Sequence, residues 1–284
     1  MSKFLKSVLA DNLAENELQY LYSSYDIIGD IAIIKIPDVL VHKKKVICDA
    51  LLKNVKNLKA VYMQSGSVTG EYRLRDLEFV SGMEIYLTTY KEYGCKFLVN
   101  VATSYFSPRL STERRRLSKL VKDDEAVLNM FAGVGTFSVI MAKEKRIKIT
   151  NFDSNLDAFI LSVINSKINK VDGSISSVHG DAKILLESDI YKDKFDRILL
   201  PLPEKAHEFI DVSIKCLKPK GGFLHFFSHV KGDKKSSVIA NSEANIRKLF
   251  GRYSYQITHT QIVRAVAPRI YQTVTDLFLV KDCI

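Results

Sequence analysis

The pattern of hydrophobic and polar positions in the first third of the chain changes between helical and strand spacing. Apolar side chains recur at helical spacing over residues 1–20, and again over residues 41–57, where lysines occupy the opposite face. We expect an amphipathic helix in each segment. A β-rich run at residues 25–36 is interrupted by a Gly-Asp pair, which predicts a hairpin or a bulged strand. Two further runs, at residues 60–64 and 83–90, have strand composition.

From about residue 125 onward the pattern becomes regular, with short β-prone runs separated by helical segments. This alternation predicts right-handed crossovers and a parallel, doubly wound sheet. The last part of the chain differs, because two long β-rich runs follow one another without a helix, which predicts an antiparallel hairpin. The expected strands lie at residues 126–131, 146–153, 174–181, 195–203 and 221–229, two of the helices at 155–169 and 204–217, and the hairpin at 253–266 and 269–280.

These patterns predict a small α+β domain at residues 1–97, followed by an α/β domain at residues 98–284. A parallel sheet of five strands that ends in an antiparallel hairpin resembles the class I S-adenosylmethionine-dependent methyltransferases. Ordinary nucleotide-binding dehydrogenases do not normally end in this way.

Net charge and cysteine spacing limit the classes of partner and the cellular compartment that we expect. The formal net charge of the 284 residues is +10, and residues 98–284 carry 29 basic against 20 acidic side chains. This balance favours a nucleic acid as partner, although a merely soluble basic protein would have it too. We expect no membrane segment, no signal peptide and no metal site. The four cysteines are scattered without a CxxC pair, so we expect no disulfide framework and a cytoplasmic location.

A glycine-containing turn, NMFAGVGTFSV, follows the first strand of the α/β domain. Gly133 and Gly135 let the backbone approach a ligand closely, and the next helix directs its N-terminal amides at that ligand. Asp153 ends the second strand, where a carboxylate can accept both ribose hydroxyls, and Asp181 ends the third, near an adenine amino group. The third glycine of the dinucleotide fingerprint is missing, which argues against NAD and favours an adenosyl ligand. Taken singly, the turn and the two aspartates could be purely structural.

Five blocks of sequence are more specific. YFSPRLSTERRRLSKL at residues 105–120, together with YDIIGD, GEYRLRDLE, NMFAGVGTFS and LPLPEKAHEF, resembles the archaeal-eukaryal tRNA (guanine-N1)-methyltransferase family. That family modifies guanosine 37 beside the anticodon. The resemblance covers essentially the whole chain and implies a class I fold, S-adenosyl-L-methionine as methyl donor, and tRNA as substrate. Family members commonly carry an N-terminal domain that reads the outer corner of tRNA, and we expect this chain to be a form without it, acting as a monomer.

Methylation at guanine N1 requires a base and a hydrogen-bond donor. N1 carries a proton at neutral pH, and negative charge moves onto O6 as that proton leaves. By their positions in the matching motifs, the resemblance implies Glu113 as the base, best served by a pKa raised through burial, and Arg73 as the donor at O6. It further implies substrate binding by Tyr105, Arg109, Pro201 and Pro203, and cofactor binding by Arg114, Phe131, Gly133, Gly135, Asp153, Ser154, Asp181 and Ala182.

These charged residues also have structural interpretations. Glu113 could pair on a helix surface with Arg116 at i+3 or with Arg109 at i−4. Arg73 and Arg75 could be ordinary charges on a strand face. The run of three arginines from residue 114 is typical of a solvated face, although just before the cofactor strand it could bind backbone phosphate or the methionine carboxylate.

Two positions depart from the family pattern. Asn129 stands where Asp is usual, which removes a negative charge near the cofactor amine, and Pro201 stands where Asn is usual, which removes a side-chain contact to guanine. The leading hypothesis is methyl transfer to N1 of guanosine 37. A related wyosine-pathway transferase on the same scaffold, or a non-catalytic tRNA-binding protein, remains open.

Overall fold

The computed structural model describes residues 2–22, 24–66 and 70–281, and the chain divides into two compact units, Met1–Pro108 and Arg109–Ile284. The sequence predicted the division at residue 97. That residue lies inside strand β6 (Cys95–Asn100), which pairs along its whole length with β5 (Leu87–Glu92) of the first unit. In the structure the boundary between the units therefore lies after the β5-β6 pair, and both strands belong to the first unit.

The first unit has the predicted α+β character. Its other elements are α1 (Ser2–Val8), α2 (Glu15–Leu18), β1 (Tyr25–Ile28), β2 (Ile31–Ile34), the 3₁₀ helix η1 (Asp38–Lys43), α3 (Lys44–Asn54), β3 (Ala60–Gln64) and β4 (Leu77–Gly82). A four-stranded sheet runs in the order β1-β2-β3-β4, and β5-β6 form a separate pair. The hairpin predicted at residues 25–36 is β1-β2. Leu5, Ile34 and Leu51 are fully buried in the core that the sheet shares with α1 and α3.

Two local predictions in this unit were wrong. Instead of the one helix expected at residues 1–20, the described residues 2–20 form two short helices, because poor helix formers at 11–12 fall between them. Leu9 and Leu13 are buried without a continuous helix. The strand expected at 83–90 begins only at Leu87, because the preceding strand β4 ends at Gly82. Gly82 has φ +93°, and a Cβ there would lie 2.1 Å from the carbonyl oxygen of Lys59, so the chain can turn at this point only with glycine.

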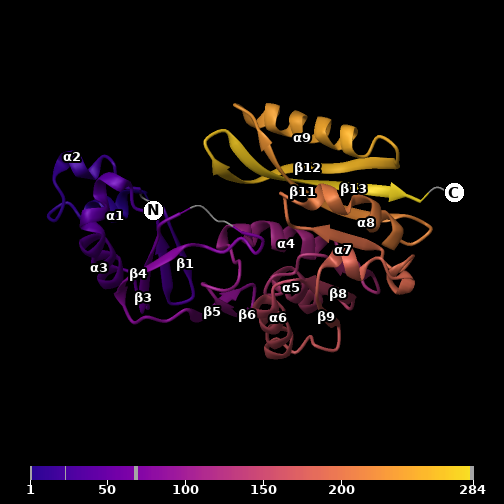
Figure 1. Ribbon diagram of the computed structural model, residues 1–284, viewed down its shortest axis with the longest axis horizontal. Coiled ribbons are helices and arrows are strands. Elements are labelled where there is room, and N and C mark those ends of the chain that lie inside the picture. The colour runs from indigo at the N-terminus through magenta and orange to yellow at the C-terminus, as the bar shows by residue number, and fades with distance from the viewer. Residues whose placement is uncertain (1, 23, 67–69, 282–284) are drawn as a thin grey trace. The chain divides into compact units, whose positions relative to one another are not determined.

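The second unit is the predicted doubly wound α/β domain. Its elements are η2 (Pro108–Leu110) at its start, α4 (Ser111–Leu120), β7 (Ala126–Asn129), α5 (Thr136–Glu144), β8 (Lys148–Asp153), α6 (Leu156–Ile168), β9 (Ile175–His179), α7 (Ala182–Leu185), η3 (Asp189–Tyr191), β10 (Arg197–Leu200), η4 (Ala206–Phe209), α8 (Ile210–Cys216), β11 (Gly222–Lys231), α9 (Lys235–Leu249), β12 (Ser254–Ala267) and β13 (Ile270–Val280) (Figure 1). Seven strands run in the order β12-β13-β11-β10-β7-β8-β9. The five strands from β11 to β9 are parallel, and β13 and β12 add the predicted antiparallel hairpin beside β11. The predicted fold class is confirmed.

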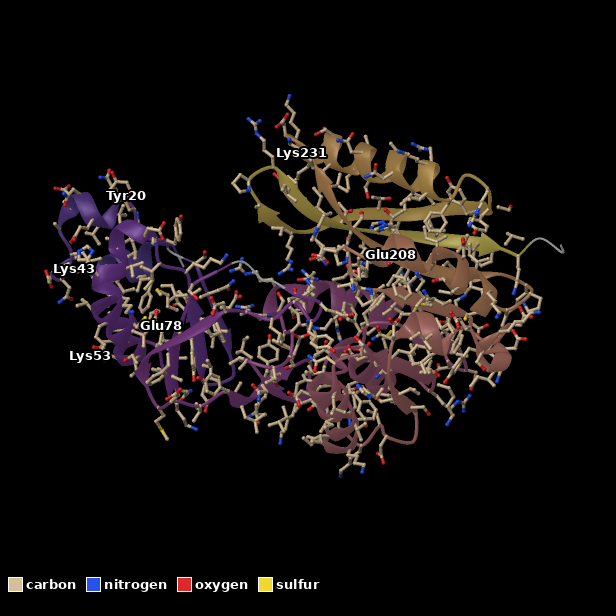
Figure 2. The ribbon with its side chains drawn as sticks, viewed as in Figure 1. Tyr20, Lys43, Lys53, Glu78, Glu208 and Lys231 are labelled. Atoms are coloured by element: carbon tan, nitrogen blue, oxygen red, sulfur yellow. The ribbon has the colours of Figure 1, made fainter. Side chains whose placement is uncertain are left out.

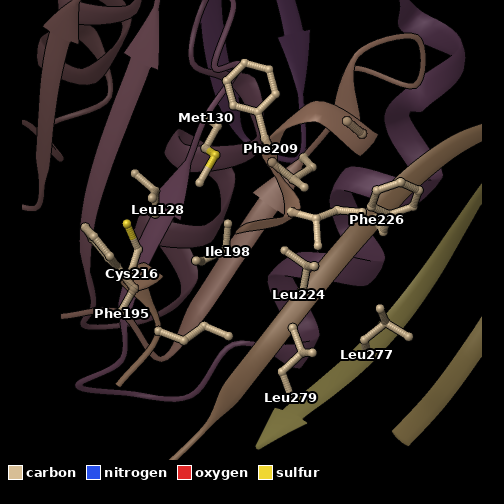
Figure 3. Close-up of a cluster of buried hydrophobic side chains, with 14 of the residues drawn as sticks. Leu128, Met130, Phe195, Ile198, Phe209, Cys216, Leu224, Phe226, Leu277 and Leu279 are labelled. Atoms are coloured by element: carbon tan, nitrogen blue, oxygen red, sulfur yellow. The ribbon is translucent and has the colours of Figure 1, made fainter. Parts of the chain in front are cut away.

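The two faces of this sheet differ in chemistry. On one face, side chains such as Leu128, Ile198 and Leu224 pack in a buried apolar cluster with residues of η4, α8 and α9 (Figure 3). Because side chains alternate along a strand, His225 points to the opposite face from Leu224. That opposite face also carries Asp276, which faces His225 across the β11-β13 pair. The sheet thus has one apolar face and one face with buried ionisable groups.

No helix within residues 2–22, 24–66 and 70–281 is long and apolar enough to cross a membrane.

Candidate active site

The glycine turn between β7 and α5 has the predicted form. Gly133 and Gly135 both adopt left-handed backbone conformations, with φ +55° and +83°. A Cβ at residue 135 would lie 2.8 Å from the Oγ of Ser162 on α6, so the turn packs closely against that helix. Glycine at 135 is therefore required both by the backbone conformation and by space.

Asp153 joins this turn to the end of the neighbouring strand. Its Oδ2 accepts a hydrogen bond from the Gly133 amide at 2.6 Å, and its Oδ1 accepts one from the Asn155 amide at 2.9 Å. Burial raises the pKa of the Asp153 carboxyl, against the lowering effect of those two amides. Each carboxylate oxygen has lone pairs beyond the one in use, so the group can still accept from the hydroxyls of a ribose.

Asn129 takes part in a buried polar network beneath the turn. Ser138 Oγ donates to Asn151 Oδ1 at 2.5 Å, so it must accept the bond from Asn129 Nδ2 at 3.1 Å. Asn129 Oδ1 is left buried without a hydrogen-bond partner among the described residues. The amide of Asn129 can therefore donate to the Ser138 hydroxyl. An aspartate at this position has no proton to donate, and the proton of the Ser138 hydroxyl is already donated to Asn151.

The remaining candidates at this edge differ in exposure. Asp181 is exposed and accepts the Lys183 amide at 2.8 Å as the N-cap of α7, so the strand end is also a helix cap. Ala182 is buried in the apolar cluster. Ser154 is half-buried and its carbonyl lies 3.1 Å from His179 Nε2, and the half-buried ring of Phe131 packs edge-on against Phe209.

These features fit an adenosyl ligand. Parallel pairing brings the ends of β7, β8 and β9 to one edge of the sheet, where Asp153 lies opposite His179. That edge combines a glycine turn, a carboxylate fixed by two amides and an unused amide oxygen. The assignment of individual residues to the cofactor stays a prediction.

Pro201 and Pro203 follow the end of β10, which lies beside β7 with Leu199 opposite Asn129. Pro201 is half-buried and Pro203 is buried. The Leu202 carbonyl between them accepts the amides of Lys205 and Ala206 and so starts a tight turn. The two prolines thus fix the chain where the fourth parallel strand ends.

Glu113 lies on α4 with only 2% of its surface exposed. It accepts two hydrogen bonds from Arg116, at 2.9 Å from Nε and 2.7 Å from Nη2, and one from Gln261 Nε2 at 2.5 Å. The i+3 pair foreseen in the structural interpretation is therefore present, but it is buried and not on a helix surface. Burial raises the pKa of Glu113 above its ordinary value, against the lowering effect of Arg116.

Arg116 is the first member of a hydrogen-bonded chain of ionisable groups that the sequence did not predict. Its guanidinium also donates to Asp276 at 2.6 and 3.1 Å, and Asp276 Oδ1 lies 2.6 Å from His225 Nδ1. His225 Nε2 lies 2.7 Å from Nη1 of Arg197, which in turn is paired with Glu125 at 2.8 Å. The signal in the sequence was an ionisable residue inside each of three otherwise apolar strands, RILL, FLHFF and VTDLF.

The arginine run is not a solvated face. Arg114 is 1% exposed, and the Arg116 side chain is 19% exposed. Arg115 forms an ion pair with Glu144 on α5. The third member of the run, Arg116, donates to Glu113.

In the first unit, Arg73 and Tyr105 lie together, with the guanidinium carbon of Arg73 4.5 Å from the centre of the Tyr105 ring. Arg73 has φ +55° in a turn before β4, and Arg75 also lies outside the strand, so the strand-face interpretation of both arginines was wrong. Arg109 is exposed and lies in η2. Of the predicted residues, the structure brings Arg73 and Tyr105 together in the first unit and Asp153 and Gly133 together in the second, whereas Glu113 is paired with Arg116.

No group of three or more His, Cys, Asp or Glu within the described ranges could hold a metal ion.

The doubly wound sheet with its terminal hairpin and the glycine turn beside Asp153 define a class I methyltransferase. The chain belongs to the TRM5/TYW2 methyltransferase family. The model of the TRM5/TYW2 methyltransferase domain matches residues 88–249, and that of the TYW2 N-terminal domain matches residues 5–84. The family resemblance is confirmed.

Relatives of two named activities are similar to the chain. The tRNA (guanine(37)-N(1))-methyltransferase Trm5b of Pyrococcus abyssi is 36% identical over 93% of this chain and 77% of the relative. The tRNA 4-demethylwyosine(37)-methyltransferase Taw21 of Saccharolobus solfataricus is 33% identical over 91% of this chain and 95% of the relative. Among solved structures, the complex of aTrm5 with tRNALeu matches with a TM-score of 0.82 and 31% identity, covering 96% of this chain and 77% of that one.

Proposed function

We propose that the chain is a tRNA (guanine(37)-N1)-methyltransferase that transfers a methyl group from S-adenosyl-L-methionine to N1 of guanosine 37. The observation that carries the proposal is a buried carboxylate with a raised pKa, Glu113, in a chain whose relative Trm5b is named for this reaction. A base for guanine N1 needs a pKa closer to neutrality than that of a solvated glutamate.

The residues around the glycine turn support the donor assignment. When bound, S-adenosylmethionine supplies the electrophilic methyl carbon. Asp153 would accept the ribose hydroxyls, and the turn at Gly133 and Gly135 would allow the backbone to approach the ligand. We assign the adenine end to Asp181 and Ala182, and further contacts with the donor to Phe131, Ser154 and Arg114.

The residues that we assign to proton removal from guanine N1 have separate roles. Glu113 would take the N1 proton onto a carboxylate oxygen, which leaves the N1 electron pair free to attack. Arg73 would donate to O6, where negative charge develops, and Tyr105 already holds its guanidinium through the stacked ring. Arg109, Pro201 and Pro203 would contact the tRNA and the base. Because Glu113 and Arg73 fall in different units, each role is tested by its own variant.

Charge supports tRNA as the polyanionic partner. The net charge is +10, and exposed lysines such as Lys53 in the first unit and Lys231 at the end of β11 extend from the surface (Figure 2). Binding through such groups releases counterions from the RNA, so its affinity should fall steeply with salt.

The test is incubation of unmodified tRNA carrying guanosine 37 with isotope-labelled S-adenosylmethionine, followed by nucleoside mass spectrometry. We expect labelled 1-methylguanosine at position 37. Glu113→Gln and Arg73→Ala should each lower the single-turnover rate about a hundredfold or more. Glu243→Gln, which changes a helix residue paired with Arg247 on α9, is the matched control and should retain the wild-type rate. A wild-type protein that labels no guanosine would refute the proposal.

A second candidate is methylation of 4-demethylwyosine at position 37. Two observations favour it: the chain matches 95% of the length of Taw21, and Pro201 cannot offer a side-chain hydrogen bond to guanine. The same assay on tRNA that carries 4-demethylwyosine separates the two activities by the mass of the product nucleoside. If the chain binds tRNA but gives no calorimetric signal with S-adenosylmethionine, it is a non-catalytic tRNA-binding protein.

We further propose that the protein acts as a monomer in the cytoplasm. Cys48 and Cys216 are buried free thiols, which supports a reducing compartment. Light scattering should return the mass of one chain, 32.2 kDa, and a value near twice that would contradict the monomer.

A further inference from the structure

Two carboxylates share one guanidinium in the second unit. The edge of Arg116 formed by Nε and Nη2 donates to Glu113 at 2.9 and 2.7 Å. The edge formed by Nη1 and Nη2 donates to Asp276 at 2.6 and 3.1 Å. Both contacts are bidentate, and both carboxylate side chains are at least 96% buried.

The proton positions in the rest of the chain follow from Arg197. A guanidinium cannot accept a hydrogen bond, so His225 Nε2 must accept from Arg197 Nη1 at 2.7 Å. The remaining ring proton is then on Nδ1, which donates to Asp276 Oδ1 at 2.6 Å. His225 is therefore a neutral imidazole, consistent with a pKa lowered by burial.

The cluster as a whole has an excess negative charge. Glu113, Asp276 and Glu125 are three carboxylates, whereas Arg116 and Arg197 are two cations, and the linking imidazole is neutral. Among these linked groups, the carboxylates exceed the cations by one, which favours binding of one proton, and the neighbouring buried cation on the same helix is Arg114.

Of the linked groups, Glu113 takes that proton with the least loss, because Arg116 keeps Asp276 as a charged partner when Glu113 is neutral. Asp276 accepts hydrogen bonds from both Arg116 and His225, so its negative charge is better compensated than that of Glu113. Protonation of His225 would place an N–H against the cation of Arg197. Among the described residues, the other hydrogen bond to Glu113 comes from the neutral amide of Gln261, whose Oε1 lies 3.2 Å from His259 Nε2.

The charges on the neighbouring helix do not alter this balance. The charged group that α5 presents to α4 is Glu144, which is paired with Arg115 and with Lys119 at 3.2 Å. The negative charge of Glu144 is therefore neutralised by these two cations of α4.

We propose that Asp276 is a positioning residue that sets the basicity of Glu113 by holding half of the Arg116 guanidinium. With Asp276 charged, Arg116 is already neutralised, so the excess negative charge resides on Glu113. When Glu113 receives the N1 proton from guanine, Arg116 remains paired with Asp276 and the cluster becomes neutral. This inference rests on the proposed base role of Glu113, but the charge sharing itself exists without substrate.

The variant that tests it is Asp276→Asn. The amide oxygen can still accept one hydrogen bond, but the charge is lost, so Arg116 is left to Glu113 alone. The carboxylate form of Glu113 is then favoured, its pKa falls, and it becomes a weaker base. We expect the single-turnover rate above the acid limb to fall about tenfold and the acid limb to move to lower pH, with KM for tRNA and for S-adenosylmethionine within about twofold.

Two further variants separate this role from general structural damage. Asp276→Glu keeps the charge and should restore much of the rate and the position of the acid limb. Asp211→Asn removes a charge of the same kind from an exposed pair with Arg252, and it should leave both unchanged. An acid limb that stays in place in Asp276→Asn would overturn the proposal.

A titration that needs no activity completes the test. The Glu113 carboxyl can be followed by carbon NMR in protein labelled at glutamate, with Glu113→Gln used to assign its signal. The wild-type pKa should lie above that of a solvated glutamate, about 4.3, and should drop in Asp276→Asn. If Asp276→Asn does not fold, the wild-type titration decides alone, and a value at or below 4.3 overturns the proposal. A wild-type protein that fails to methylate tRNA but shows the raised pKa would refute the proposed function and leave the charge sharing in place.

Discussion

Arg75 donates a hydrogen bond to Asp26 at 2.8 Å, and the two side chains are only 10% and 11% exposed. The same guanidinium nitrogen lies 3.3 Å from the carbonyl oxygen of Phe106. Arg75 therefore ties strand β1 to the segment that carries Tyr105, the ring on which Arg73 is stacked. Two arginines separated by one residue thus have different tasks: Arg75 fixes the scaffold, and Arg73 is positioned by it.

The first prediction is that Arg75→Ala destabilises the protein. It removes the guanidinium that pairs with the buried Asp26 carboxylate, which should cost about 3 kcal/mol in the free energy of unfolding. Arg73→Ala removes a half-buried side chain that stacks on Tyr105, and it should cost less than about 1 kcal/mol. Urea unfolding followed by circular dichroism measures both.

Methyl transfer should show the opposite order for folded protein. We expect Arg73→Ala to lower the methyl-transfer rate about a hundredfold or more in a stable chain, and equal losses of stability in the two variants would contradict the division of roles.

The second prediction concerns Gly135. Gly135→Ala must adopt φ +83° with a side chain and place its Cβ 2.8 Å from Ser162 Oγ, so the turn has to shift. We expect the affinity for S-adenosylmethionine to fall at least tenfold by calorimetry, and stability to fall by about 1–2 kcal/mol. Gly173→Ala is the matched control, because a Cβ there meets nothing within 4 Å. Similar affinity in both variants would mean that the turn does not contact the donor.

The sheet and the turn could be predicted from the sequence because they depend on neighbours in the chain. Alternating strands and helices determine a parallel sheet, and a carboxylate at a strand end such as Asp153 meets the preceding turn by topology alone. The division after Pro108, by contrast, depends on how β5 and β6 pack, which local periodicity does not report.

The surroundings of Glu113 could not be predicted in the same way. Arg116 at i+3 was in view, but Asp276 lies 160 residues further along the chain and reaches Arg116 only because β13 inserts beside β11. Without that third group, the pair resembled a surface helix contact of little energetic value. What the sequence did offer was the presence of His225 and Asp276 within apolar strands, since buried ionisable residues need partners.

The third prediction separates the two aspartates of the cofactor edge. Asp153 is bonded to the glycine turn itself, whereas Asp181 is exposed and caps α7. Asp153→Asn replaces one carboxylate oxygen by an NH2 group that cannot accept a hydrogen bond. The variant therefore loses the hydrogen bond either from the glycine turn or from a ribose hydroxyl. We expect it to weaken S-adenosylmethionine binding about tenfold or more, and Asp181→Asn to weaken it only a few-fold. Calorimetry on both variants checks the order, and a larger effect at Asp181 would reverse the assignment.

The fourth prediction links Glu113 to stability. Burial raises its pKa in the folded protein, so the folded state binds this proton more tightly than the unfolded state does. The stability that this group contributes is present below the ordinary glutamate pKa and is lost as the pH rises through the raised value. In its charged form the buried Glu113 therefore destabilises the folded protein, as expected for the group proposed as the base.

If Glu113 is the base, Glu113→Gln should remove both this destabilisation and methyl transfer. At pH 7.5 we expect the variant to be about 1 kcal/mol more stable than the wild type, seen as a melting temperature about 2–4 °C higher. At pH 4 the wild-type side chain is largely protonated in both states, so the difference should nearly vanish. Thermal unfolding followed by calorimetry at the two pH values measures this. A variant less stable than the wild type at pH 7.5 would show that Arg116 stabilises the carboxylate by more than burial destabilises it, and Glu113 would then be a structural anion instead of a base.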